Sequence, residues 1–149
     1  MDVTASLTAD VGPEVLYDVV ADLGGYPQWL ESVPRADPVD TVRGDTGPAW
    51  SVDLRGRVGP LSRSKRLRMV RTRHEPPNLA VFERRELDGR HHSDWILRAA
   101  VRSEDARTST LTMELHYGGT MWVPLLDRLL AEEIERSIRP VLALIATAG

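Results

Sequence analysis

Two amphipathic helical patterns, one near each end of the sequence, restrict the fold more than any other feature. The first covers residues 13–23, begins with Pro13 where a missing N–H costs little, and ends at Gly24. The second covers residues 120–146, with apolar residues at three- and four-residue steps. Pro140 lies inside it and is expected to bend its axis. Since strand-like segments fill the chain between the two patterns, this order predicts a sheet packed around one long C-terminal helix.

Alternating apolar and polar residues between the two helices predict a series of strands. A short second helix opens at Tyr26, directly after the first. The predicted strands cover residues 4–9, 39–42, 50–55, 67–71, 79–87, 95–101 and 111–117. Turn signals at 56–60, 75–78 and 88–89 separate neighbouring strands, which is typical of an antiparallel meander. The register of 79–87 stays open, because Val81 and Phe82 point to opposite faces.

Composition sets the class of protein. A length of 149 residues fits one domain, residues 1–149, with its own core. A net charge of -3 argues against a nucleic-acid partner, which usually needs a basic face. The sequence has no cysteine, no apolar run near the roughly 20 residues that span a bilayer, and no charged-then-apolar leader pattern. We therefore expect a cytoplasmic protein without a membrane span, either a monomer or a homodimer.

Several short motifs occur in an order that resembles the SRPBCC superfamily, also called START-like or helix-grip. They are residues 13–22, residues 26–29, the Pro76-Pro77 pair, Trp95 two residues before Leu97, and Gly118-Gly119 ahead of the last helix. The similarity covers nearly the whole chain and points to the polyketide cyclase/dehydrase and coenzyme Q-binding-protein-like branch. It implies an α+β helix-grip fold: a seven-stranded antiparallel sheet wrapped around a long C-terminal helix, two short helices after the first strand, and a cavity between sheet and helix.

The apolar faces of the strands and of the last helix are the candidate lining of this cavity. Ligand pockets are mostly apolar, with a few polar groups, and the alternative is a filled core. Met69 and Met113 suit a pocket wall because their side chains adapt in shape. The candidate ligand-binding residues are Trp50, Val52, Leu54, Leu67, Met69, Arg71, Glu83, Trp95, Leu97, Met113, Leu115, Tyr117, Trp122, Leu126 and Leu130.

Two of these candidates are charged. Arg71 continues the alternation of Leu67 and Met69, so its side chain is expected to point inward, where it needs a polar partner. Glu83 is that partner if the face of Val81 is the inner one. The alternative places Arg71 at the rim of the sheet, in water.

Neither the histidines nor the other cations form a recognisable site. The histidines are His74, His91, His92 and His116. None has a metal-ligand spacing, so we expect no metal and no cofactor. Residues 55–73 hold eight cations, which form either a patch for an anionic partner or the solvated outer face of a hairpin. In the second case, the acids that balance them are expected to be Glu83, Glu86 and Asp88.

Three functions remain open at this point. The first is the binding, transport or presentation of a hydrophobic small molecule such as a lipid, a quinone or an aromatic polyketide, which is compatible with transient contact at a membrane surface. The second is a polyketide cyclase, aromatase or dehydratase, although the sequence has no catalytic motif and this function needs a titratable group inside the cavity. The third is a protein- or RNA-interaction module that uses the basic hairpin 55–73.

Overall fold

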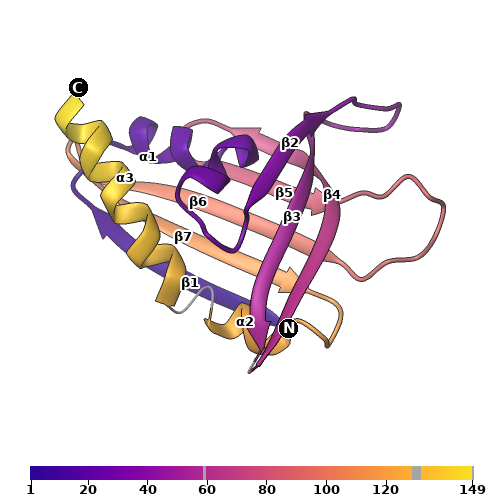
Figure 1. Cartoon of the computed structure of the whole chain (residues 1–149). Helices are drawn as coiled ribbons and strands as arrows, with labels where there is room; N and C mark the ends of the chain where they lie inside the picture. Colours follow the sequence, from indigo (N-terminus) through magenta and orange to yellow (C-terminus); the bar gives the residue numbers. More distant parts are fainter. Residues whose placement is uncertain (59, 129–131, 149) are drawn as a thin grey trace.

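A single seven-stranded sheet forms the body of the protein in a computed structural model that describes residues 1–58, 60–128 and 132–148 (Figure 1). The strands are β1 (Asp2–Ala9), β2 (Arg35–Val39), β3 (Ala49–Val58), β4 (Leu61–Glu75), β5 (Leu79–Arg84), β6 (Trp95–Asp105) and β7 (Thr108–Tyr117). Their order across the sheet is β1-β7-β6-β5-β4-β3-β2, and every neighbouring pair is antiparallel. The predicted α+β fold with a seven-stranded antiparallel sheet is therefore confirmed.

Each of the seven strands has at least one boundary that differs from the sequence prediction, and β1, β4, β6 and β7 are longer than predicted. β3 continues through Gly56, which pairs with Arg63, so the ladder occupies most of the predicted turn 56–60. β2 covers residues 35–39 rather than 39–42, with Pro38 inside it; β2 is an edge strand, where a residue without an N–H is tolerated. β5 ends at residue 84 rather than 87. These differences move strand ends and leave the order of the strands unchanged.

Two short helices follow β1, as predicted. Helix α1 (Pro13–Val20) has Pro13 in its first turn and buries Leu16, Tyr17 and Val20. The 3-10 helix η1 (Leu23–Gln28) is capped by Asp22, whose carboxylate accepts a hydrogen bond of 2.9 Å from the N–H of Gly24. Both helices lie on the face of the sheet that also carries the C-terminal helix (Figure 1).

The structure describes two parts of the long helix predicted over residues 120–146. The structure has α2 (Val123–Arg128) and α3 (Ile134–Ala148), and residues 129–131 between them lie outside the described residues. α2 contacts β3, whereas α3 contacts β1 and α1, so the two helices cover different parts of the sheet (Figure 1). The predicted helix spans both parts, because Leu126 and Ile134 keep helical spacing. No helix in the described ranges has both the length and the apolar character needed to cross a bilayer.

The core lies between the inner face of the sheet and these helices, and an aromatic cluster occupies its centre. Phe82 is fully buried, with its ring 5.8 Å from that of Trp50 and 6.4 Å from that of Tyr26. Trp29 packs on Tyr26 at 4.8 Å. The register that the sequence left open is thereby settled: Phe82 points inward, and the neighbouring Val81 and Glu83 belong to the outer face.

Candidate ligand cavity

An apolar cavity of about 70 Å³ lies between the sheet and the helices. Strands β3, β4, β6 and β7 supply one wall, and η1, the segment after it, α2 and α3 supply the other. The lining residues are Leu23, Tyr26, Leu30, Val33, Val52, Leu54, Leu67, Met69, Trp95, Leu97, Met113, Leu115, Leu126 and Ile134. Two of these residues carry a polar N–H or O–H group, the indole N–H of Trp95 and the hydroxyl of Tyr26. The hydroxyl of Tyr26 donates to the carbonyl of Val20 at 2.8 Å. The walls can therefore hold apolar matter, and the indole N–H of Trp95, a buried donor with no hydrogen-bond partner among the described residues, is the one lining N–H or O–H group left unpaired.

The sheet wall of the cavity follows directly from strand alternation. Val52 lies opposite Leu67 in the β3–β4 register, and Leu97 lies opposite Leu115 in the β6–β7 register. Residues two positions apart on a strand share a face, so each of these pairs extends into a row of inward side chains. Eight of the fifteen predicted cavity residues line the cavity for this reason: Val52, Leu54, Leu67, Met69, Trp95, Leu97, Met113 and Leu115. Leu126 of α2 is the ninth predicted residue in the lining.

Three predicted aromatic residues lie in the core and do not line the cavity. Trp50 packs on Phe82. Tyr117 and Trp122 both pack on Trp95, at ring distances of 4.5 Å and 6.4 Å. They support the cavity wall from behind, because Trp95 itself belongs to the lining. Leu130, the last of the predicted apolar residues, lies outside the described residues.

The two charged candidates do not meet. Nη1 of Arg71 donates to the carbonyl of Ala21, at the end of α1, at 2.9 Å. Glu83 is on the outer face and pairs with Arg85 at 3.2 Å. Since neither residue lines the cavity, the geometry offers no inward Arg71–Glu83 pair.

Five lining residues were missed by the sequence prediction: Leu23, Tyr26, Leu30, Val33 and Ile134. Four of them come from η1 and the irregular segment after it, where neither the strand period nor the helix period applies. The sequence signal that could have indicated these residues was the three-residue spacing of Leu30 and Val33, which follow the Tyr26-Pro27 dipeptide. Ile134 was visible as part of the apolar stripe of the last helix.

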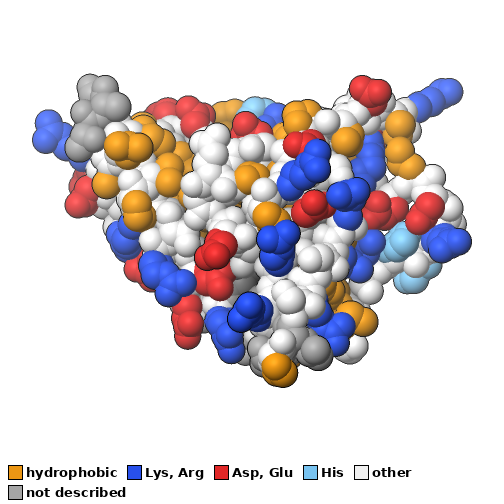
Figure 2. Space-filling view, in the orientation of Figure 1, with side chains coloured by type: hydrophobic (Ala, Val, Ile, Leu, Met, Phe, Trp, Pro, Cys, Tyr) orange, Lys and Arg blue, Asp and Glu red, His pale blue; other side chains and the backbone are white. Residues whose placement is uncertain are grey.

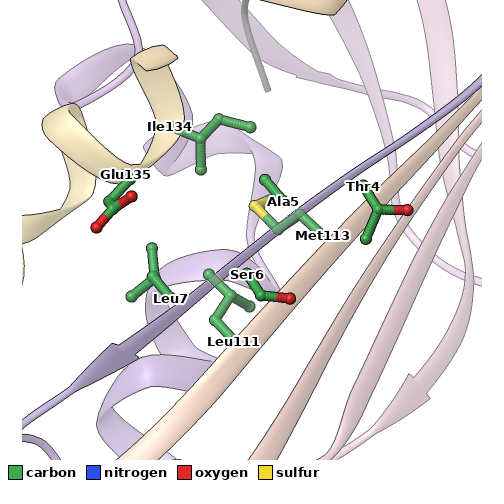
Figure 3. Close-up of a pocket in the computed structure, with 8 residues that line it drawn as sticks. All are labelled: Thr4, Ala5, Ser6, Leu7, Leu111, Met113, Ile134 and Glu135. Carbon is green, nitrogen blue, oxygen red and sulfur yellow. The ribbon is translucent and has the colours of Figure 1, made fainter. Parts of the chain in front are cut away.

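A more open hollow of about 140 Å³ lies at the β1 edge of the sheet, under α3 (Figure 3). Figure 3 shows Ile134 and Glu135 on α3 facing Leu7 of β1 and Leu111 of β7. Met113 and Ile134 line both this hollow and the apolar cavity. These two side chains therefore form the partition between the interior and the open edge.

The basic run 55–73 is partly neutralised on the outer face. Arg66 pairs with Asp53 at 2.8 Å, and Arg68 pairs with Asp45 at 2.7 Å. The acids predicted to balance the run instead pair elsewhere: Glu83 with Arg85, Glu86 with Arg84, and Asp88 with His92. Arg73 pairs with Glu75 of its own strand. The balance thus comes from β3, the loop before it and the end of β4 rather than from β5 and the turn after it.

The histidine with the most buried partner is His74. Its Nδ1 lies 2.6 Å from the hydroxyl of Tyr17, which also donates to the carbonyl of Leu79 at 3.1 Å. A phenol has one proton, so both contacts are hydrogen bonds when Nδ1 of His74 carries a proton and donates it. Burial, together with the charge of Arg71, lowers the pKa of His74, which favours the neutral imidazole. Among the described residues, no group of three or more histidine or carboxylate side chains is placed to hold a metal ion.

Comparisons with known proteins agree with this architecture. The chain is similar to a START superfamily protein from Mycobacterium smegmatis, with 12% identity, 97% of this chain and 98% of that chain covered, and a TM-score of 0.72. It is also similar to an HSP90 activator from Plasmodium falciparum (12% identity, 96% of each chain, TM-score 0.64). A third match is the di-domain ARO/CYC BexL from the BE-7585A biosynthetic pathway (14% identity, 95% of this chain and 48% of that chain, TM-score 0.61). At these identities the likeness shows the fold alone. No curated protein matches the sequence.

The family comparison covers the whole length of the fold. The model for the family described as polyketide cyclase / dehydrase and lipid transport matches residues 1–148. The START superfamily structure shares the sheet and helix arrangement over nearly the same length, and the resemblance drawn from the sequence motifs is confirmed. The chain therefore belongs to the polyketide cyclase / dehydrase and lipid transport family.

Proposed function

We propose that this protein binds a hydrophobic small molecule in the cavity between the sheet and the C-terminal helices. The observation that carries the proposal is the lining of apolar and aromatic side chains, drawn from both walls of the fold. Removing apolar ligand surface from water contributes roughly 25 cal/mol per Å². Such a wall therefore favours an apolar ligand without any specific polar contact.

The cavity has to widen for this function. Its volume of about 70 Å³ is well below the roughly 300–1,000 Å³ of ordinary small-molecule sites. The flexible side chains of Met69 and Met113 line it, and Met113 and Ile134 separate it from the hollow at the β1 edge. Movement of these two partition residues would join the two spaces and give a ligand a path inward.

Binding is proposed rather than catalysis because the lining offers no acid or base. Among the described lining residues, Tyr26 is the one titratable group. Its proton is held by the carbonyl of Val20, and burial raises its pKa far above the ordinary value. A cyclase or dehydratase reaction needs a proton donor or acceptor within reach of a bound carbonyl, so the second function has no residue to support it here.

A cavity-filling variant tests the proposal. We expect Val52→Phe to weaken ligand binding at least tenfold, because the larger ring occupies the space while the apolar character of the core is kept. The free energy of unfolding should change by less than about 3 kcal/mol, the usual upper cost of overpacking. Binding is measured by Nile red titration, and by native mass spectrometry after incubation with a bacterial lipid extract.

The matched control is Val42→Phe, which adds the same ring at an exposed position (41% accessible). This control should bind as the unmodified protein does. If Val52→Phe folds and binds the dye and the lipids unchanged, the cavity is not the binding site and the proposal fails.

A further inference from the structure

One lysine lies on the inner face of the sheet, directly beside residues that line the apolar cavity. Lys65 of β4 pairs with Leu54 of β3 and is two positions from Leu67 of its own strand. Leu54 and Leu67 both line the cavity. Residues that pair across two strands, or stand two positions apart on one strand, share a face of the sheet. Lys65 therefore flanks the lining, with no strand or helix between them.

A contact of Arg63 supports this assignment of the face. Arg63 is two positions before Lys65 on β4, so the two side chains belong to the same row. Nη1 of Arg63 donates to the sulfur of Met121 at 3.4 Å. Met121 stands just before α2, the helix that supplies Leu126 to the opposite wall of the cavity. The row that contains Lys65 thus faces the helices.

A largely buried ion pair acts on Lys65 from the neighbouring strand. Arg84 of β5 pairs with the lining residue Met69 in the β4–β5 register, so it too belongs to the inner face. Its Nε donates to Glu86 at 2.7 Å, and the two side chains are 8% and 20% exposed. The charges of Arg84 and Glu86 both act on the Lys65 ammonium. We call Lys65, Arg84 and Glu86 the Lys65 cluster.

Lys65 is the member of the cluster that has no counter-charge in contact with it. The carboxylate of Glu86 already accepts from Nε of Arg84 and, at 3.4 Å, from the N–H of Arg68. Among the described side chains, none makes an ion pair or a hydrogen bond with the ammonium of Lys65. Burial, together with the positive charge of Arg84, lowers the pKa of Lys65. Two cations against one carboxylate leave the cluster with one net positive charge.

The cations on the other surfaces of the protein differ from Lys65. On the face drawn in Figure 2, Lys and Arg side chains are interspersed with Asp and Glu side chains. Arg66 and Arg68, on the outer face of β4, each have a carboxylate partner. An ammonium that is partly removed from water beside apolar residues is stabilised by an anion brought into contact with it. A ligand that carries such an anion would therefore be favoured at Lys65.

We propose that Lys65 binds the anionic head group of a small molecule whose apolar chain occupies the cavity. This inference rests on the proposed binding function and adds the chemical class of the ligand. A lysine lays its four-carbon stem along apolar surface and keeps its ammonium at the polar end, which suits a position between Leu54, Leu67 and the Arg84–Glu86 pair. The single net positive charge of the cluster favours a monoanion, such as a carboxylate or a phosphodiester, over a dianion.

Two ligands that share a chain and differ in the head group test this assignment. Octanoate and octan-1-ol are titrated by isothermal calorimetry at pH 7.5. We expect octanoate to bind about tenfold more tightly than the alcohol, since a hydrogen bond to a charged group contributes at the low end of its usual range when the site is partly solvated. The variant Lys65→Met, which keeps an unbranched side chain and removes the charge, should bind the two ligands equally. A preference for octanoate that persists in Lys65→Met overturns the proposal.

The control is Arg57→Met, which also removes one positive charge, from an exposed position on the neighbouring strand β3. Arg57 is one position from Gly56 and three from Leu54, so its side chain belongs to the outer face. This control should keep the preference for octanoate. If it loses the preference as Lys65→Met does, the effect is one of net charge and Lys65 is not the head-group site.

A second measurement uses the fact that Lys65 is the only lysine of the chain. Reductive methylation with ¹³C-formaldehyde labels this side chain and the N-terminal amine, and NMR follows the titration of each. Octanoate should raise the pKa of the labelled Lys65, because a bound carboxylate stabilises the ammonium, whereas octan-1-ol should not raise it. If octanoate binds and leaves the pKa of Lys65 unchanged, the head group lies elsewhere and the proposal fails.

The remaining outcomes separate this inference from the function on which it rests. Equal binding of octanoate and octan-1-ol by the unmodified protein overturns the head-group site and leaves the apolar cavity supported. No binding of either ligand overturns both. Val52→Phe, which fills the cavity, should weaken the binding of both ligands. If it leaves octanoate binding unchanged while Lys65→Met removes the preference, Lys65 binds free anions and the ligand with a head group and a chain is wrong.

Discussion

Replacing Phe82 by alanine should lower the free energy of unfolding by about 3–5 kcal/mol, the usual cost of removing a buried aromatic ring. Phe82 has no exposed surface and contacts the rings of Trp50 and Tyr26. The void cannot close easily, because Trp50 is held on β3 and Tyr26 is held by its hydrogen bond to Val20. The measurement is urea unfolding followed by tryptophan fluorescence and far-UV circular dichroism.

The loss of Phe82 should also affect the apolar cavity. Tyr26 is a lining residue of the cavity and rests directly on Phe82, so the void opens behind the wall that a ligand would touch. Leu87→Ala is the matched control, because Leu87 is 60% exposed; its effect should stay within about 0.5 kcal/mol. A loss below about 1 kcal/mol for Phe82→Ala would mean that β5 does not carry Phe82 into the core, and the inner-face assignment of the sheet would have to be reversed at that strand.

Phe82 and the cavity residues differ in whether the sequence alone could predict which face of the sheet they occupy. Strand alternation is a local rule, so it placed Val52, Leu67 and Met113 on the inner face correctly. The same rule could not decide for β5, where the four consecutive residues 79–82 are all buried. The decision there depends on Tyr26, more than fifty positions away in the sequence, and no pattern within the strand contains that contact.

The helical side of the cavity was harder to predict, for two physical reasons. Leu30 and Val33 lie in an irregular segment whose direction is set by tertiary contacts such as the bond from the N–H of Arg55 to the carbonyl of Ser32. Arg71 was expected to point inward with a carboxylate partner, yet a backbone carbonyl at the end of α1 takes that role. A backbone carbonyl partner cannot be predicted from residue types, because every residue has a backbone carbonyl.

The buried ion pair on the outer face gives the second large effect. We expect Asp45→Asn to lower the free energy of unfolding by about 2–4 kcal/mol at pH 7, because it leaves the guanidinium of Arg68 without its counter-charge in a site where both side chains are at most 10% exposed. Arg68 also donates to the carbonyls of Asp40 and Arg85, so it anchors the loop before β3 to the strand pair β4–β5. Chemical denaturation of both proteins measures the difference.

The dependence on pH identifies the ion pair as the cause. Hydrogen bonds from Arg68 hold the pKa of Asp45 below its ordinary value of 3.8. A carboxylate whose pKa is lowered by folding stabilises the protein above the unfolded pKa and loses that contribution as the pH falls through the folded one. The difference in unfolding free energy between the unmodified protein and Asp45→Asn should therefore be complete at pH 6 and shrink as the pH drops below about 4.

The control is Asp53→Asn, which breaks the more exposed pair with Arg66 and should lower the free energy of unfolding by no more than about 1 kcal/mol. A gap for Asp45→Asn that is equally large at pH 3 and pH 6 would assign the loss to packing of the loop and not to the charge of Asp45.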